Sequence, residues 1–323
     1  MKKLIALLLA LVMVVGLVAC GEKAPEAAPE AAPAPEAAPE AAPEAAPEAA
    51  PEAAPEAAPE AETLYIPVMA KGFQHQFWQA VAKGSQDAAD KYGVEIYFDG
   101  PASESDIQVQ VDMVKKEMAK NPKALALAAL STEAVTEILE ECAEKNIPVI
   151  GFDSGVPGDK TGAVKATACT NNEAAAAIAA TKFGEHEGLV AAMKAATADS
   201  KVIIGCLSQD NTSASVVGRT NGFVNEMEKV ASQYGTVAIT GDPKWEKGDV
   251  NAASIVIQIA IGQTPNTVDM QNAANGLLAN ENLIALFCSN EGAVTGFLSA
   301  VSDGADLAEG GKYHGLVVAA HPN

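Results

Sequence analysis

The sequence after residue 62 predicts an α/β protein with two lobes, each a doubly wound parallel sheet, and a ligand cleft between the lobes. Short apolar runs that suit strands alternate with amphipathic stretches that suit helices. The strand candidates are apolar on both faces, which is typical of parallel strands covered by helices on both sides. The alternation pauses near residues 168–171 and then restarts, so we expect the lobe boundary there.

The first lobe, residues 63–168, is predicted to alternate strands with helices. The strand candidates are 63–69, 94–98, 124–130 and 148–152. The first helix candidate, 77–92, has apolar side chains at helical spacing and meets a common helix terminator at Gly93. Two further helices are indicated by apolar stripes: Ile107, Val111, Val114 and Met118, and then Val135, Ile138, Leu139 and Cys142.

The second lobe, residues 169–323, repeats the pattern. Helices are predicted at 173–187, 216–233, 250–261 and 293–302, and strands at 201–207, 236–240, 283–288 and 315–319. In doubly wound sheets, ligands bind beyond the carboxyl ends of the strands. The polar segments to search for a site are therefore 71–76, 100–104, 131–132, 153–154, 171–172, 209–213, 242–245 and 290–291.

The formal charge of −21 is concentrated near the amino terminus. The eleven glutamates from Glu22 to Glu62 account for about half of it. The rest of the chain is still acidic, whereas a protein that binds nucleic acid is expected to carry a basic face. Nucleic acid is therefore not expected as a partner.

The first residues are typical of an export signal. Lys2 and Lys3 precede an uncharged run, residues 4–19, that is short for a membrane-spanning helix. The run ends in Leu-Val-Ala-Cys, which resembles the bacterial lipobox and so implies cleavage before Cys20 and attachment of lipid to its thiol. Residues 1–19 would be a lipoprotein signal peptide, and the protein would lie on the outer face of the cell membrane, extracellular or periplasmic. An ordinary signal peptide or an uncleaved anchor remains an open alternative.

Residues 20–62 consist mostly of Ala-Ala-Pro-Glu repeats. A proline at every fourth position removes one hydrogen bond per helical turn and clashes with the preceding turn, so a continuous helix is excluded. We expect an extended, polyproline-like stalk that reaches on the order of 100 Å at ~3.1 Å per residue.

The cysteines and histidines do not have the spacing of a metal or catalytic site. The five cysteines contain no CxxC pair, and the last four are expected to be small buried apolar residues: Cys142, Cys169, Cys206 and Cys288. The four histidines form no HExxH motif, and neither GxSxG nor a Walker phosphate loop is present. We therefore expect a protein that is not an enzyme and that holds no metal or cofactor.

Several motifs in a fixed order resemble those of one family. They are "GFQHQFWQAVAKGSQDAADKYGV", "NIPVIGFDSGVP", "TNN", "TSASVVGRTNGF" and "LFCSNEGAVTGF". From about residue 62 to the end, the chain resembles the periplasmic sugar-binding proteins of the ribose type, which have the type I periplasmic binding fold. The resemblance implies a receptor that captures a sugar between its lobes and delivers it to an ABC permease in the membrane. A receptor that presents a sugar or signal to a sensor kinase or chemoreceptor is the alternative.

The resemblance implies a ligand site built from rings and polar groups of both lobes. The matching ring positions are Phe77, Trp78 and Trp245, and the polar positions are His75, Asp153, Arg219 and Asn290, with Asn172 as a rim group. Rings stack on the apolar C–H face of a sugar, while amides and carboxylates pair with its hydroxyls. The alternatives for Trp245 and Asn290 are a surface ring and a helix cap.

Other residues of this set also have a structural interpretation. Phe77 lies on the apolar stripe of its helix and could belong to the core, whereas Trp78 lies off that stripe. Val217 stands where the family has a ligand arginine, so Arg219 could be structural. Ser154 stands where the ribose receptors have arginine, which argues against ribose and leaves the identity of the sugar open.

The chain ends in "GLVVAAHPN". The resemblance implies further residues that return to the first lobe and complete the second. We therefore expect the second lobe to be incomplete and the chain to bind weakly or fold poorly by itself.

Overall fold

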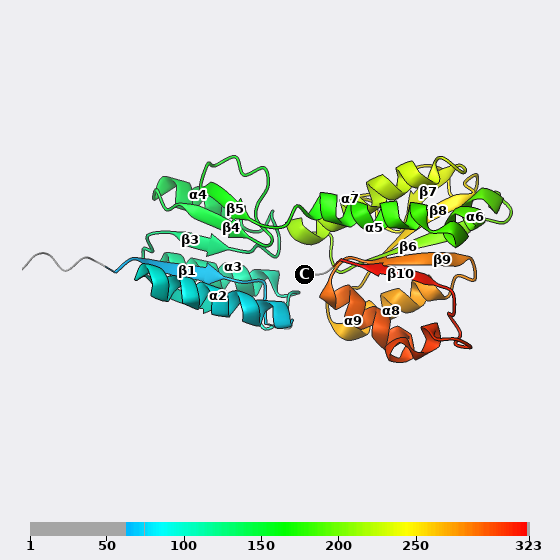
Figure 1. The fold of residues 1–323 in the computed structure, drawn as a ribbon. Coiled ribbons are helices and arrows are strands. Elements are labelled where there is room, and N and C mark those ends of the chain that lie inside the picture. Colours follow the sequence, from blue (N-terminus) through cyan, green and yellow to red (C-terminus); the bar gives the residue numbers. More distant parts are fainter. Residues whose placement is uncertain (1–62, 74, 322–323) are drawn as a thin grey trace, which may run out of the picture. The chain divides into compact units, whose positions relative to one another are not determined.

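The computed structural model describes residues 63–73 and 75–321. Within these residues the chain forms two parallel sheets of five strands each, with helices packed on both sides of each sheet (Figure 1). The predicted two-lobed α/β fold is confirmed. The signal peptide, the lipidation of Cys20 and the stalk lie outside the described residues.

The first sheet has the strand order β2-β1-β3-β4-β5. Its strands are β1 (Tyr65–Met69), β2 (Glu95–Asp99), β3 (Leu125–Leu127), β4 (Val149–Phe152) and β5 (Val164–Ala168). Its helices are α2 (Gln76–Tyr92), α3 (Ile107–Met118) and α4 (Thr136–Glu144). Helix α2 ends as expected at Gly93, whose φ of 65° is a left-handed conformation that glycine adopts without strain.

Two apolar layers flank the first sheet. Helices α3 and α4 pack on one face through residues such as Val114 and Ile138, and α2 packs on the other through Trp78. Strand β5 was not predicted. It is an edge strand in which Lys165 to Ala168 are exposed, so it lacks the apolar run by which the other strands were recognised.

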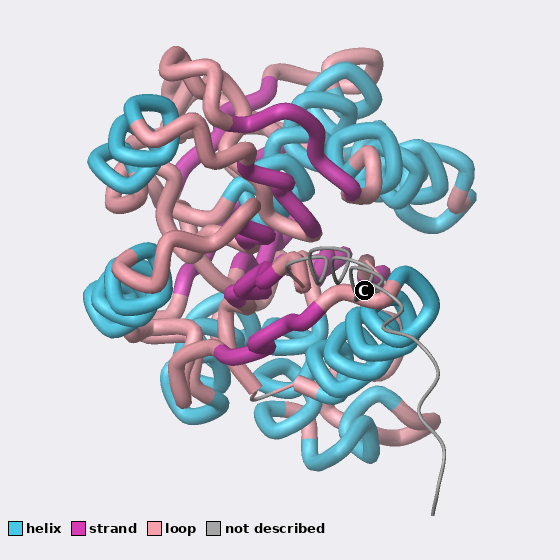
Figure 2. The backbone as a smooth tube through the Cα atoms, turned by 90° about the vertical axis from the view of Figure 1, so that its left-hand side faces the viewer, coloured by secondary structure: helices cyan, strands magenta, loops and turns pink. Residues whose placement is uncertain are grey.

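The second sheet has the strand order β10-β9-β6-β8-β7. Its strands are β6 (Val202–Ser208), β7 (Val237–Thr240), β8 (Ile255–Ile261), β9 (Leu283–Cys288) and β10 (Val317–Ala320). The helices are α5 (Asn172–Glu185), α6 (Glu187–Ala195), α7 (Ala214–Ala231), α8 (Thr267–Leu278), α9 (Glu291–Ala300) and the 3-10 helix η1 (Ser302–Leu307). Helices α5 to α7 cover one face and α8 and α9 the other, and the strands form the inner layers of the molecule (Figures 1 and 2).

The predicted helix 250–261 is wrong, because its second half is strand β8. Ile255, Val256, Ile257, Ile259 and Ile261 are β-branched, and such side chains favour a strand between two neighbours over a helix. Strand β8 pairs with both β6 and β7, so β7 becomes the outermost strand of the sheet.

The predicted helix 173–187 corresponds to α5, which ends at Glu185, and a second helix that was not predicted, α6, begins at Glu187. His186 separates the two helices. Its imidazole Nδ1 accepts a hydrogen bond of 3.3 Å from the backbone N–H of Leu189 and so caps α6. Helices α5 and α7 pack closely because Gly222 faces α5. A Cβ atom at that position would lie 2.1 Å from the backbone oxygen of Glu173.

Among the described residues, no helix is both long and apolar enough to cross a membrane.

Candidate functional site

Polar side chains that follow the strands of both sheets converge on one small cavity. The described residues that line it are Lys71, His75, Phe77, Trp78, Glu104, Asp153, Ser215, Arg219 and Asn290. Six of the eight predicted binding residues are therefore brought together. The cavity encloses only about 10 Å³, because the side chains of the two lobes meet across it.

Two aromatic rings form one wall of the cavity at the start of α2. Trp78 is 1% exposed, and its indole N–H donates a hydrogen bond of 2.7 Å to Glu104. The ring of Phe77 lies edge-on to it, 4.9 Å between centroids.

The burial of these two rings differs from the expectation based on the helix stripe. Trp78 is buried in the core, whereas Phe77 is half-buried. The indole fits because its neighbours Ala70 and Ala128 are small and because Glu104 accepts the indole hydrogen, which a buried tryptophan needs.

Lys71 and Glu104 are site residues that the sequence analysis did not identify individually. The Lys71 ammonium lies 3.6 Å from Glu104, 3.5 Å from Asp153 and 3.4 Å from the hydroxyl of Ser215 on the second lobe. Both side chains are almost fully buried. Each lies in a polar segment that follows a strand, and a charged residue at such a position was the signal that the sequence offered.

The charges of this cluster support one another. Burial alone would lower the pKa of Lys71, but Glu104 and Asp153 raise it above its ordinary value. Burial alone would raise the pKa of Glu104, but the Lys71 ammonium and the hydrogen bond from Trp78 hold that pKa below its ordinary value. Both groups are therefore charged at neutral pH, and they can donate to and accept from a polar ligand.

Asp153 follows β4 directly and has an uncommon backbone conformation. Its φ is 51°, a left-handed value that aspartate tolerates better than most residues. One carboxylate oxygen, Oδ2, is buried and has no hydrogen-bond partner among the described residues, although it faces the Lys71 ammonium. Strained residues with spare acceptor capacity are frequent at binding sites.

Arg219 enters the cavity from α7 of the second lobe. Its Nε donates a hydrogen bond of 2.8 Å to the side-chain oxygen of Asn172, and its guanidinium also donates to the backbone oxygen of Ser289 at 3.3 Å. Asn172 is not among the residues that line the cavity. Asn172 therefore orients Arg219 through this hydrogen bond and does not itself line the cavity.

Asn290 is both a site residue and a helix cap. Its side-chain oxygen accepts a hydrogen bond from the backbone N–H of Ala293 in α9, at 3.2 Å. Its amide N–H donates to Gln209 at 2.7 Å. Gln209 in turn donates to Glu104 at 2.8 Å, so a hydrogen-bonded chain passes from the second lobe to the first.

Two further hydrogen bonds connect the lobes beside the cavity. The hydroxyl of Thr212 donates to the backbone oxygen of Leu130 at 3.0 Å. The backbone N–H of Ser215 donates to the hydroxyl of Ser154 at 3.1 Å. The residues at the carboxyl ends of both sheets thus form one continuous polar contact between the lobes.

Trp245 does not line the cavity with the other predicted residues. It packs against the core of the second lobe, is 9% exposed, and donates a hydrogen bond of 2.7 Å from its indole to Asn221. The physical reason is strand β8. It lies between β6 and β7, so the segment after β7, which contains Trp245, starts at the outer edge of the sheet.

The described cysteines are only partly as predicted. Cys142, Cys206 and Cys288 are buried, and burial raises their thiol pKa values, to about 11 for Cys142 and about 12 for Cys288. Cys169 is exposed, contrary to the prediction, because it lies in the segment that connects β5 to α5. Among the described residues, no group of His, Cys, Asp and Glu side chains could hold a metal ion.

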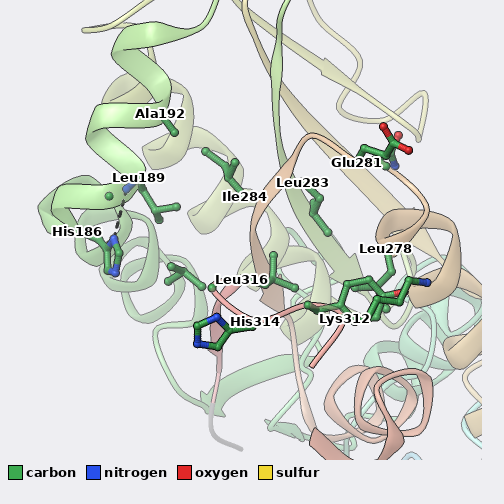
Figure 3. A pocket seen from close by; sticks show the side chains of 15 residues that line it. His186, Leu189, Ala192, Leu278, Glu281, Leu283, Ile284, Lys312, His314 and Leu316 are labelled. Carbon is green, nitrogen blue, oxygen red and sulfur yellow. Dashed lines mark hydrogen bonds between the residues drawn. The ribbon is translucent and has the colours of Figure 1, made fainter. Parts of the chain in front are cut away.

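A larger cavity, about 600 Å³, lies elsewhere in the second lobe (Figure 3). Its walls include the start of α6 and the amino ends of β9 and β10, which is the opposite end of the sheet from the converging loops. Leu189, Leu283 and Leu316 are among the residues that line it, and its His186 already uses Nδ1 to cap α6. The concentration of buried charges and paired amides makes the small inter-lobe cavity the better candidate for a binding site.

Comparison with known proteins agrees with the fold. Residues 66–319 match the family described as periplasmic binding protein domain. The chain is 26% identical over 244 residues to the D-allose-binding periplasmic protein of Escherichia coli, covering 73% of this chain and 67% of that protein.

Solved structures show the same similarity. A Brachyspira murdochii protein described as "ABC transporter, LacI family transcriptional regulator" is 36% identical with a TM-score of 0.62, covering 80% of this chain and 77% of that one. An ABC transporter solute-binding protein of Agrobacterium vitis with bound D-fucose is 25% identical with a TM-score of 0.60, covering 79% and 76%.

Proposed function

Because this chain belongs to the periplasmic binding protein domain family, we propose that it captures a sugar or sugar-like small molecule between its lobes. The observation that most supports this proposal is the composition of the cavity. Two aromatic rings, Phe77 and Trp78, lie beside Glu104, Asp153 and other polar groups in a single site formed by both lobes.

The chemistry of a sugar fits these walls. A sugar ring presents an apolar C–H face, which stacks on aromatic rings, and a rim of hydroxyls, which both donate and accept hydrogen bonds. Asp153 and Glu104 can accept from hydroxyls, and Lys71, Arg219 and Asn290 can donate to them. A hydroxyl missing from the ligand would leave one of these buried groups unpaired, so the site should discriminate between related sugars.

Capture requires the lobes to separate. The cavity of about 10 Å³ has room for about one water molecule, far less than a sugar occupies. The chain passes from the first sheet to the second through residues 169–171, between β5 and α5 (Figure 1). A rotation at this segment would open the cavity, and a sugar that contacts both lobes would favour closure, since a ligand shifts such an equilibrium by its differential affinity.

The proposal includes delivery to an ABC permease from the outer face of the membrane. The lipobox-like Leu17–Cys20 supports a lipid anchor on Cys20, and the Ala-Ala-Pro-Glu repeats support a stalk that would hold the lobes away from the membrane. The relatives' descriptions name ABC transport systems, D-allose and D-fucose, so these two sugars are the first ligands to test.

A thermal-shift screen of the whole chain tests the proposal. The panel contains D-allose, D-fucose, D-arabinose, D-tagatose and about a hundred other sugars and polyols. A sugar at a hundredfold excess over its Kd stabilises the folded protein by about 2.7 kcal/mol, which is a rise in Tm of about 5–10 °C for a protein of this size. Calorimetry then measures the Kd of each hit. A chain that unfolds cooperatively yet shows no shift and no heat with any of them contradicts the proposal.

A further inference from the structure

His75 lies between carboxylates of both lobes. Its Nε2 is 3.9 Å from Glu104 of the first lobe, and its Nδ1 is 4.0 Å from Glu291, the first residue of α9 in the second lobe. The imidazole is largely enclosed, at 13% exposed, and its Nε2 has no hydrogen-bond partner among the described residues. An imidazole that gains a proton here would face an acceptor on each side.

The other charged groups around His75 partly oppose its protonation. Glu104 also forms an ion pair with the ammonium of Lys71, which weakens its attraction for a protonated imidazole. The amino terminus of α9, the positive end of the helix dipole, also lies in this region. The remaining charged side chains of the cavity are Asp153 and Arg219. Two carboxylates lie within ion-pair distance of the imidazole nitrogens, Glu104 at 3.9 Å and Glu291 at 4.0 Å.

We propose that His75 is a pH-dependent bridge between the lobes, whose protonation strengthens closure and tightens sugar capture. This inference rests on the proposed function. Imidazoles change charge between about pH 5 and pH 8, whereas carboxylates are ordinarily ionised throughout that range.

The sign of the effect follows from which state brings the groups together. In the closed arrangement the imidazolium can donate from both nitrogens to Glu104 and Glu291, whereas a neutral imidazole donates from only one. Separation of the lobes moves Glu291 away from His75, because the two residues belong to different lobes. Closure is therefore favoured at low pH, and this advantage is lost as the pH rises and His75 loses its proton.

A sugar titration at two pH values tests the bridge. D-allose and D-fucose are titrated calorimetrically into the whole chain at pH 6 and pH 8. We expect the better-bound sugar to bind about two- to tenfold more tightly at pH 6, the range that corresponds to one or two partly exposed ion pairs.

Three variants separate the bridge from general effects of pH. His75→Gln should bind with equal affinity at both pH values, and Glu291→Gln should lose at least half of the pH dependence on a logarithmic scale. The control is Glu187→Gln, which removes a glutamate from the first turn of another second-lobe helix, α6, and should keep the full dependence. An affinity that is independent of pH in the parent chain, or a dependence that survives in His75→Gln, overturns the inference while leaving sugar binding intact.

A second measurement does not depend on the sugar. Spin labels on Lys83→Cys in α2 and Lys229→Cys in α7, in a background with both Cys20→Ser and Cys169→Ser, report the separation of the lobes without ligand; both lysines are exposed. We expect the distance distribution to move toward shorter values at pH 6 and not to do so when His75→Gln is added. If no sugar binds at either pH but this shift is seen, the bridge stands and the proposed function fails; an unchanged distribution without sugar binding overturns both.

Discussion

Replacement of Glu104 by glutamine tests the buried charge cluster most severely. The carboxylate is 3% exposed and lies 3.6 Å from the Lys71 ammonium. It also accepts hydrogen bonds from Trp78 at 2.7 Å and from Gln209 at 2.8 Å. Glu104→Gln keeps the size of the side chain, but it removes the charge and turns an N–H donor toward one of these two donors.

The expected loss of stability follows from these contacts. Removing one partner of a buried ion pair costs about 3–5 kcal/mol. Asp153 remains 3.5 Å from the Lys71 ammonium and offsets part of that cost. We therefore expect the free energy of unfolding to fall by about 2–4 kcal/mol, which lowers Tm by about 5–15 °C for a protein of this size.

Urea denaturation followed by circular dichroism measures this change. The matched control is Glu141→Gln, which breaks an exposed pair with Lys145 and should cost less than about 0.5 kcal/mol. The double variant Lys71→Met with Glu104→Gln should be about 1–3 kcal/mol more stable than the sum of the single changes predicts. The reasoning is refuted if Glu104→Gln behaves like the surface control or if the two changes are additive.

Three further outcomes can be checked with the same methods. Gly222→Ala should lower the free energy of unfolding by more than about 2 kcal/mol, because its Cβ would lie 2.1 Å from the backbone oxygen of Glu173. Gly276→Ala, which has open space around it in α8, should raise the free energy of unfolding by about 0.5–1 kcal/mol. A similar effect of both substitutions on urea denaturation would contradict this packing. Trp245→Phe should destabilise the second lobe but change the Kd for a sugar by less than about twofold, since the ring lies outside the cavity; loss of binding in calorimetry would show otherwise. The pKa of Glu104 is held below its ordinary value in the folded protein, so its contribution to stability is present above that ordinary value and is lost as the pH falls through the lower, folded value. The difference in the free energy of unfolding between the parent and Glu104→Gln should therefore shrink in acid, and a constant difference would refute this linkage.

The alternation of apolar and amphipathic segments predicted most of the architecture, because that pattern depends on local burial. Two of the misses have identifiable physical causes. Residues 255–261 carry an apolar pattern compatible with either a buried strand or a helix, and their place between β6 and β7 is decided by pairing with distant strands. Strand β5 is an exposed edge strand, so its sequence has no run of apolar residues by which it could be recognised.

The candidate site was predictable as a set of loops and less so as a set of side chains. Its loops follow strands, and the carboxyl ends of parallel strands all lie at the same edge of a sheet. Lys71 and Glu104 escaped notice because their importance comes from partners more than thirty residues away, such as Asp153. Trp245 matched a family position in the sequence, but the strand between β6 and β7 places it elsewhere.

The burial of Trp78 illustrates a further limit of sequence patterns. A helix stripe identifies the side that faces the sheet in the middle of a helix, but the first turn of α2 also faces residues beyond the ends of the strands. There Ala70 and Ala128 leave room for a large ring, and Glu104 provides the acceptor. These contacts depend on residues from three segments, so no local pattern contains them.

A crystal structure of the whole chain with its tightest-binding sugar tests the central claim most directly. We predict the sugar between the lobes, with a ring face against Phe77 or Trp78 and with hydroxyls bonded to Asp153 on one lobe and Asn290 on the other. A sugar bound in the cavity beside His186 and His314, or contacting a single lobe, would contradict the account.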